Sequence, residues 1–344
     1  MGPGLRFGTG TTVKDFVAYR EWLRVAEDAG FDLLTTGDSQ SLWADPFTIM
    51  SVAADRTTRA RLAVTVSNPK TRHPAVAASA CAAVQKISGG RFAFGVSSGD
   101  SALRNIGVRA AKVDEIGAYV RALQALTAGE RIDWDGAPLQ LHWLGEDPPA
   151  VPIWMGAEGP RTQRLAGEIA DGVVLSNCLT RDAYELATAN IAEGARAAGR
   201  SLDDIEIWCM ANIVPAATER EGIDQITYLL AGTANHVYRF ATAGKGLPDH
   251  LVEPMLALMS EYDSRHHAQR DTALAHNNAT LVDKYGLRDY LAPRSTIAGP
   301  PGRCIERLHE IAENGPRNLI LAQFVADPLA WMRSVATEIL PALR

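Results

Sequence analysis

The stretch RFAFGVSSGDSALRNIG, residues 91–107, passes from an apolar run through small side chains into a helical pattern. Its first part, residues 91–96, predicts a buried strand. The residues that follow, Ser97, Ser98 and Gly99, carry so little side-chain bulk that their backbone N–H groups can approach a ligand closely. A strand that ends in such a loop and leads into a helix is the repeating unit of parallel α/β folds.

The same alternation of strand and helix signals recurs along the chain. Further apolar runs predict strands at 5–8, 31–37, 62–66, 151–156, 172–177, 205–214 and 318–324. Eight strands, each leading to a helix, match a (β/α)8 TIM barrel, and we expect residues 1–344 to form one such α/β domain. The rival fold, a doubly wound sheet, usually has fewer strands and a GxGxxG fingerprint, which the sequence FGTGTT near the start does not match.

Two segments depart from this rhythm. Residues 131–141 predict a hairpin with Asp135 and Gly136 at its turn. Residues 219–290 are long and mostly helical, and they fall between the seventh and eighth predicted strands. We expect them to form a helical insertion, a lid, over the end of the barrel where the strands finish.

Composition narrows the class of function. The 344 residues are 47% hydrophobic, which allows a sizeable core, and the formal net charge of −6 argues against a nucleic-acid partner. No apolar run approaches the ~20 residues that span a membrane, and the start of the chain lacks the regions of a signal peptide. The four cysteines are far apart, which argues against disulfides or zinc. We therefore expect a cytoplasmic protein without a membrane partner.

In a TIM barrel the functional side chains lie on the loops that follow the strands. Two of these loops, 97–101 and 156–160, lead into helices, where N–H groups and the helix dipole favour a phosphate. The alternative is that their glycines only allow turns and that Asp100 only caps a helix. The polar residues on the other loops are Thr9, Asp38, Ser39, Asn68, Arg72, His73 and Ser176.

Asp38 and His73 are the candidate acid and base groups. Asp38 follows a strand, where a carboxylate either transfers protons or caps the next turn. His73 and Arg72 either contact a polar ligand or simply precede the proline that starts a helix. No metal site is expected, because the adjacent residues His266 and His267 point about 100° apart on a helix.

Several segments, taken together and in this order, resemble the luciferase-like superfamily of flavin and deazaflavin oxidoreductases. The sequences NPKTRHP and GDSA are most similar to the branch related to methylene-tetrahydromethanopterin reductase, which uses the deazaflavin coenzyme F420. The segments are AEDAGFD (26–32), SNPKTRHPAV (67–76), SGGRFAFGVSSGDSA (88–102), PIWMGAEGPRTQRLAGEIADGVVLS (152–176) and IAGPPGRCIERLHEIAENG (297–315).

This resemblance implies a TIM barrel that holds the tricyclic ring of F420 or flavin mononucleotide (FMN) in its mouth. It also implies a non-proline cis peptide at Thr65–Val66, which forms a bulge behind the ring. The cofactor contacts that we expect are Thr9, Thr65, Val66, Asn68, Ser97, Ser98, Gly99, Ala157, Glu158, Gly159 and Ser176. The expected catalytic residues are Asp38 and His73, and the expected substrate contacts are Ser39, Arg72, Tyr262 and His266.

One departure from the superfamily bears on the reaction. Its deazaflavin dehydrogenases often have Asp-His after the second strand, and the histidine serves as base on an alcohol. Here the pair is Asp38-Ser39, so alcohol oxidation by that route is not expected unless His73 substitutes. The resemblance favours F420-dependent hydride transfer with a small-molecule substrate. The alternatives are a monooxygenase that uses reduced FMN and a separate flavin reductase, and a non-catalytic ligand-binding barrel. A homodimer is expected because the superfamily often dimerises.

Overall fold

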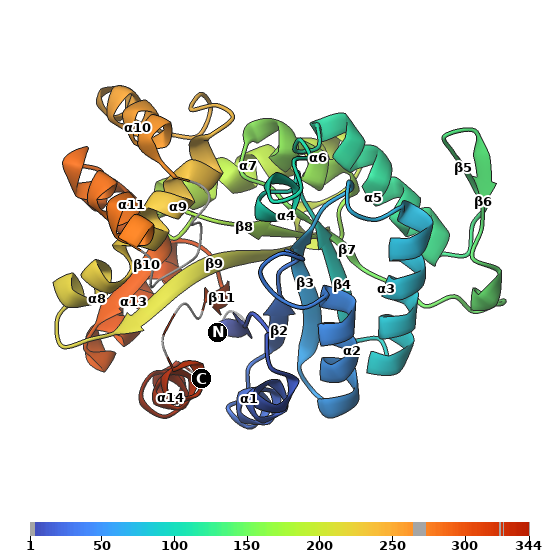
Figure 1. The fold of residues 1–344 in the computed structure, drawn as a ribbon, viewed down its shortest axis with the longest axis horizontal. Coiled ribbons are helices and arrows are strands. Elements are labelled where there is room, and N and C mark those ends of the chain that lie inside the picture. Colours follow the sequence, from blue (N-terminus) through green and yellow to red (C-terminus); the bar gives the residue numbers. More distant parts are fainter. Residues whose placement is uncertain (1–3, 264–272, 323–324, 326, 344) are drawn as a thin grey trace.

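The computed structural model describes residues 4–263, 273–322, 325 and 327–343, and its centre is a closed parallel barrel (Figure 1). Within these residues the barrel strands neighbour one another in the order β9, β11, β1, β2, β3, β4, β7 and β8, and β8 pairs back onto β9. The expected (β/α)8 TIM barrel is therefore confirmed. Its strands are β1 (Arg6–Gly10), β2 (Leu33–Thr36), β3 (Arg61–Ser67), β4 (Phe92–Val96), β7 (Ile153–Gly156), β8 (Gly172–Leu175), β9 (Glu206–Pro215) and β11 (Asn318–Ala322).

Helices surround the barrel on the outside (Figure 1). Helices in the first half of the chain often begin at an acidic cap. One example is Asp45, which precedes Pro46 and whose carboxylate accepts from the two backbone N–H groups that follow the proline. The helices are α1 (Phe16–Asp28), α2 (Pro46–Arg56), α3 (Pro74–Ser88), α4 (Ser101–Arg104), α5 (Val113–Thr127), α6 (Pro160–Ile169), α7 (Arg181–Ala197), α13 (Pro301–Asn314) and α14 (Pro328–Ser334). None of the helices in the described ranges combines the length and apolarity that a membrane crossing needs.

The predicted hairpin is confirmed as β5 (Ile132–Trp134) and β6 (Ala137–Leu139), and it projects from the side of the barrel (Figure 1). Asp135 and Gly136 both have positive φ, 51° and 79°, as a two-residue hairpin turn requires.

The sequence pattern did not predict a further strand, β10 (Thr296–Gly299), beside the barrel. It forms because β9 is long. The first half of β9 pairs with β8 inside the barrel, and its last residues, 212–215, run past the barrel and pair with β10.

Between β9 and β10 the structure describes a group of helices on the opposite side of the molecule from the hairpin (Figure 1). They pack around an apolar core of their own, which includes Leu230, Met255, Leu258 and Leu291. These helices are α8 (Glu219–Gln225), α9 (Thr227–Tyr238), α10 (Asp249–Glu261), α11 (Ala273–Lys284) and α12 (Arg288–Ser295), so helical structure continues beyond residue 290.

The barrel interior is filled at the N-terminal ends of the strands, which we call the lower end. Trp154 and Trp208 are completely buried there. Below them, the Glu206 carboxylate is bound by two guanidinium groups: Arg6 donates to one oxygen at 2.8 Å, and Arg61 pairs with the other. Each arginine also lies over a tryptophan ring. This end is closed by packing and paired charge.

Candidate functional site

At the C-terminal ends of the strands, the upper end, two hollows of about 240 Å³ and 300 Å³ adjoin each other. They share a wall, and we call the two together the inner cavity. The shared residues are Thr65, Val66, Asp100, Ser101, Met210, His236 and Ala322. This is the position at which TIM-barrel enzymes carry their active sites.

A backbone bulge forms the floor of the inner cavity. The peptide bond between Thr65 and Val66 is cis, as predicted, and the pairing of β3 with β4 shifts register between Val64 and Ser67. Gly95 on β4 lies directly against this bulge. A Cβ atom at Gly95 would come within 2.7 Å of the Val64 carbonyl oxygen and 2.8 Å of the Val66 side chain. The bulge therefore requires glycine on the neighbouring strand.

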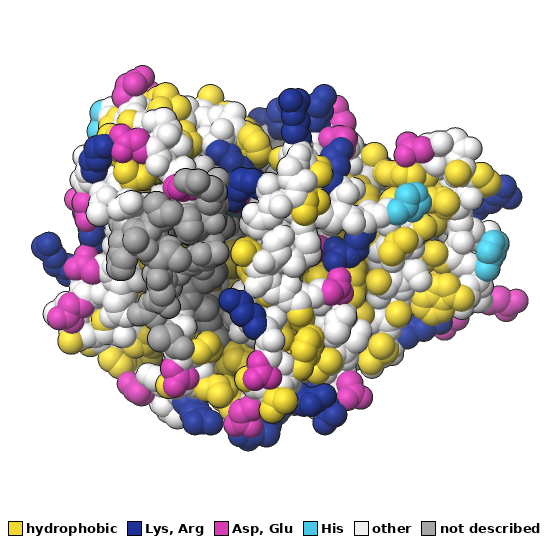
Figure 2. All heavy atoms as spheres, in the orientation of Figure 1, with side chains coloured by type: hydrophobic (Ala, Val, Ile, Leu, Met, Phe, Trp, Pro, Cys, Tyr) yellow, Lys and Arg dark blue, Asp and Glu magenta, His cyan; other side chains and the backbone are white. Residues whose placement is uncertain are grey.

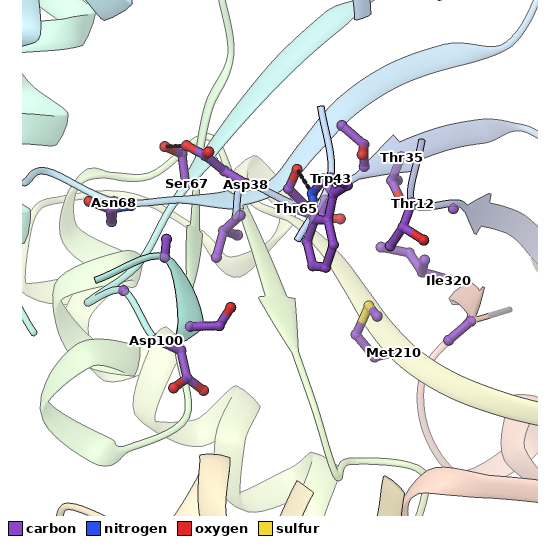
Figure 3. A pocket seen from close by; sticks show the side chains of 18 of the residues that line it. Thr12, Thr35, Asp38, Trp43, Thr65, Ser67, Asn68, Asp100, Met210 and Ile320 are labelled. Atoms are coloured by element: carbon purple, nitrogen blue, oxygen red, sulfur yellow. Dashed lines mark hydrogen bonds between the residues drawn. The ribbon is translucent and has the colours of Figure 1, made fainter. Parts of the chain in front are cut away.

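Asp38 lines this cavity, and one of its two carboxylate oxygens has no partner among the described residues. The Ser67 hydroxyl donates to Oδ2 at 2.5 Å, and Arg72 pairs with the same oxygen. The other oxygen, Oδ1, is buried and has no partner among the described residues, and Asp38 lines the cavity. Arg72 also donates to Asp45 at 2.6 Å, so it is fixed from two sides. In Figure 3, Asp38 and Ser67 lie on one side of the pocket and Met210 and Ile320 on the other, with the Trp43 indole between them in this view.

A third hollow, the outer cavity, of about 590 Å³, adjoins the inner one on the side of α6. It is lined by both loops of anion-site composition, through Ser97, Ser98, Glu158 and Gly159. Gly99, which lies in the first of these loops and lines the inner cavity, has φ of +86°, a conformation that favours glycine. Gly159 is the N-cap of α6, so the positive end of that helix points at the outer cavity.

Basic side chains from α9 and the loop after it surround these two loops. Arg239 pairs with Asp100 and donates to the Gly99 carbonyl at 3.2 Å. Lys245 and Arg239 both line the outer cavity. Asp100 also pairs with Arg104 at 2.9 Å, so two arginines neutralise this carboxylate. The outer cavity is lined by Lys112, Arg161, Arg239 and Lys245 against Asp114 and Glu158, so it has a cationic character.

His236 of α9 lies between the two loops and lines all three hollows. Its Nδ1 is 3.4 Å from Asp100 Oδ2, and its Nε2 is 3.7 Å from Glu158 Oε1. Burial would lower the pKa of His236, but the hydrogen bond with Asp100 and the charge of Glu158 outweigh it and raise the pKa to about 9. His236 is therefore an imidazolium at neutral pH.

A bulged floor, the two loops 97–101 and 156–160, which we call the glycine loops, and the basic side chains of the outer cavity thus lie together at the upper end of the barrel. The sequence model of one protein family, described as luciferase-like monooxygenase, matches residues 4–318. The chain belongs to this family.

Proteins similar to this chain match it over nearly its whole length. A 5,10-methylenetetrahydromethanopterin reductase of Archaeoglobus fulgidus is 27% identical over 94% of this chain and 95% of its own. An F420-dependent glucose-6-phosphate dehydrogenase of Beutenbergia cavernae is 28% identical over 96% of this chain and 94% of its own. The solved structure of a coenzyme F420 dependent tetrahydromethanopterin reductase from Methanopyrus kandleri superposes with a TM-score of 0.75 at 23% identity, over 99% of this chain and 100% of that one.

In this luciferase-like protein most of the predicted site residues surround the cavities. Asn68 is nearly fully buried, and its Oδ1 accepts from the backbone of Lys70 and Thr71, so its oxygen holds its own loop. The Ser176 N–H donates to Glu158 at 3.1 Å. The inner cavity is lined by Asp38, Thr65, Val66, Asn68, Ser97, Gly99, Glu158 and Ser176, and the outer cavity by Ser97, Ser98, Glu158 and Gly159.

His73 and Ser39 lie outside the linings of the cavities. His73 is exposed and forms the N-cap of α3, where its Nδ1 accepts from Ala75 N–H. It therefore cannot replace the absent histidine as a base. Ser39 is 1% exposed, lines neither cavity, and bonds to the Ser101 hydroxyl at 2.9 Å. Its hydroxyl supports the loop after β4 and does not meet a substrate.

Thr9 and Ala157 were also predicted as cofactor contacts, and both are completely buried outside the cavity linings. The strand β1 extends to Gly10, so Thr9 lies inside the barrel wall and donates to the Leu321 carbonyl at 3.1 Å. The N–H of Ala157 is already bound to the Val174 carbonyl at 3.2 Å and cannot serve a ligand.

The other predicted substrate contacts are Arg72, Tyr262 and His266. Arg72 lines neither cavity and acts on the site only through Asp38. Tyr262 follows α10, and burial raises its pKa, but it does not line the cavities either. His266 lies outside the described residues.

Several lining residues were not among the predicted site residues. Trp43 lines the inner cavity and donates to the Gly37 carbonyl at 3.1 Å, which holds its indole in place. Met210, on β9, lines both halves of the inner cavity. The sequence signal that could have identified Trp43 is the presence of a tryptophan in the loop after β2. The contacts of α9 with loops more than 70 residues away leave no local signal in the sequence.

Proposed function

We propose that this protein is an F420-dependent oxidoreductase that transfers a hydride between the deazaflavin ring and a small organic substrate. The observation that carries the proposal is the joined pair of cavities. The inner one has a bulged floor and a carboxylate, and the outer one has glycine loops and basic side chains. The two similar curated proteins described above are a methylenetetrahydromethanopterin reductase and an F420-dependent dehydrogenase, which supports the choice of F420 over FMN.

The residues present fit such a cofactor. A Cβ at Gly156 would come within 3.2 Å of Ser97 Cβ and 3.3 Å of Val66 Cγ1, so glycine lets the first glycine loop and the bulge pack closely against β7 between the cavities. The N–H groups of Ser98 and Gly99 have no backbone partner among the described residues and are available to a phosphate. Arg239 and Lys245 add positive charge at the outer cavity and would hold the acidic tail of F420 there.

When bound, the deazaflavin supplies hydride chemistry at its central ring. The residues of this chain then bind, orient and handle protons. Asp38 lines the inner cavity and its Oδ1 has no partner among the described residues, so the proposal gives it the role of accepting a hydrogen bond or a proton from a substrate atom beside the reacting carbon. Arg72 and Ser67 fix the carboxylate through Oδ2 and leave Oδ1 unpaired. Trp43 and Met210 supply apolar walls that exclude water.

Titration with F420 and FMN, each oxidised and reduced, tests the proposal. We expect F420 to bind and its fluorescence to change on binding. Lys245→Glu reverses one charge of the outer cavity and is expected to weaken F420 binding about tenfold or more. Lys14→Glu, at an exposed lysine away from both cavities, is the charge-matched control and should bind F420 like the unmodified protein.

The second candidate is a monooxygenase that uses reduced FMN, oxygen and a separate flavin reductase. The description of the matching family, luciferase-like monooxygenase, favours keeping it. Tight binding of reduced FMN with oxygen uptake, and no binding of F420, would replace the first proposal with this one. Binding of neither cofactor would leave a ligand-binding barrel without redox chemistry.

We also propose that the protein forms a homodimer through the face that carries the hairpin. Val76, Ile87 and Trp143 are large hydrophobic residues exposed there. Figure 2 shows hydrophobic side chains gathered on that side of the molecule, over the region of α3 and the β5–β6 hairpin. Surfaces of this kind mark protein contacts. Sedimentation should give a dimer for the unmodified protein and a monomer for a variant with Val76→Lys and Ile87→Glu.

A further inference from the structure

His236 has three features that the proposed function does not use. It lines both halves of the inner cavity and the outer cavity, so it lies where the ring and the tail of a cofactor would meet. It comes from α9, outside the barrel, whereas its two partners lie on barrel loops. Its hydrogen bond runs from Nδ1 to Asp100, and Nε2 lies 3.7 Å from Glu158, beyond hydrogen-bond distance.

The surrounding charges determine what the imidazole can do. Asp100 and Glu158 are the carboxylates that face it, and both favour its protonated form. The nearby basic groups are Arg104, Arg239 and Lys245. Both arginines pair with Asp100, and Lys245 faces the outer cavity rather than the inner one. Of the basic side chains named here, His236 is therefore the one that lines the inner cavity.

We propose that His236 supplies the positive charge that stabilises the reduced form of the cofactor. The inference rests on the proposed function. Uptake of a hydride from a reduced carbon substrate adds two electrons and one proton, so the ring gains one negative charge unless a second proton follows. A fixed cation on the cavity wall lowers the free energy of this more negative state by more than it lowers that of the oxidised ring, which carries one negative charge fewer. Asp100 and Glu158 are positioning residues that keep the imidazole charged and in place.

Separate dissociation constants for oxidised and reduced F420 test this role, because a residue that only holds α9 in place would change both alike. We expect His236→Asn to weaken binding of reduced F420 about tenfold while oxidised F420 changes less than about threefold. The same variant should lower the midpoint potential of the bound cofactor. His250→Asn, at an exposed histidine of α10, is the matched control and should change neither constant.

The pH dependence gives a second readout. In the unmodified protein the preference for reduced F420 should fall as the pH rises through about 9, where the pKa of His236 lies, and His236→Asn should remove this dependence. By linkage, reduced F420 must raise the pKa of His236 by the same factor, about one pH unit for a tenfold preference. The His236 ring signal in proton NMR, assigned by its loss in His236→Asn, measures this value directly and separates it from Lys245.

The outcomes are distinct. An equal loss of affinity for both redox states in His236→Asn, or an unchanged ratio, would overturn this inference and leave the proposed function standing. Failure of the unmodified protein to bind F420 would overturn the proposed function. If FMN binds instead, the same ratio is measured with FMN, and an unchanged ratio there also overturns the role of His236. Binding of neither cofactor overturns both.

Discussion

The two ends of the barrel each hold a carboxylate beside arginine, and they use it differently. At the lower end both oxygens of Glu206 are occupied, one by Arg6 and one by Arg61. At the upper end Arg72 and Ser67 share one oxygen of Asp38 and leave the other without a partner. A saturated carboxylate can only hold structure together, whereas an unsaturated one beside a cavity can bind a ligand. Counting the partners of each oxygen therefore separates a structural acid from a functional one.

The largest expected effect comes from replacing the Asp38 carboxylate, one oxygen of which has no partner among the described residues. Asp38→Asn should reduce kcat/KM about 100-fold or more, because an amide cannot accept a proton. It also removes the carboxylate of the buried ion pair with Arg72, so the melting temperature should fall and the rates are compared where both proteins are folded. The measurement is the change in F420 absorbance with a substrate that the unmodified protein converts. Asp45→Asn also takes a carboxylate from Arg72, but asparagine still caps α2, and Asp45 lies outside the cavities. Equal losses in both variants would contradict the assignment.

A second test places one methyl group at each end. Gly95→Ala would drive a Cβ against the bulge, and Gly172→Ala would drive one to within 2.6 Å of the Trp154 ring at the lower end. Both should lower the free energy of unfolding by about 1–3 kcal/mol, measured by urea denaturation. F420 affinity should fall about tenfold only in Gly95→Ala, since only that glycine supports the cavity floor. Loss of affinity in Gly172→Ala would show that the ends are not independent.

Glu206→Gln tests whether the carboxylate at the lower end of the barrel has only a structural role. It leaves Arg6 and Arg61 without their anion at a partly buried position, and we expect the free energy of unfolding to fall by about 1–2 kcal/mol. F420 binding and turnover should stay within twofold of the unmodified protein. A large loss of turnover at unchanged stability would mean that the lower end takes part in the reaction.

The smallest expected effect is the pH dependence of stability from His236. Its pKa is raised in the folded protein, so its contribution to stability is complete below about pH 6.5 and is lost as the pH rises through about 9. The difference in unfolding free energy between the unmodified protein and His236→Asn should therefore narrow over this range. Urea denaturation at pH 6, 7.5 and 9.5 measures it, and a difference that grows with pH would exclude a charged His236.

The barrel could be predicted because its signals are local: apolar runs followed by small residues marked the strands and their loops. The cis peptide at Thr65–Val66 was predicted from the family resemblance and not from a local pattern. Some predicted site residues lie just outside the cavity linings. Thr9 lies inside the wall because β1 runs to Gly10, and the Ser39 hydroxyl turns to Ser101. The role of His236 was beyond reach, since it depends on α9 folding back onto residues 100 and 158.

The length of β9 has a consequence for how this protein can be changed. One half of the strand completes the ring, and the other half carries β10, with the helices that follow β9 packed around their own apolar core. The barrel and the helices that follow β9 are therefore both built on this one strand. Exchanging these helices for those of a relative would leave the strands of the closed ring in place, but their contacts with the barrel would have to be rebuilt, including those of α9 with the two glycine loops and the ion pair of Arg294 with Asp182.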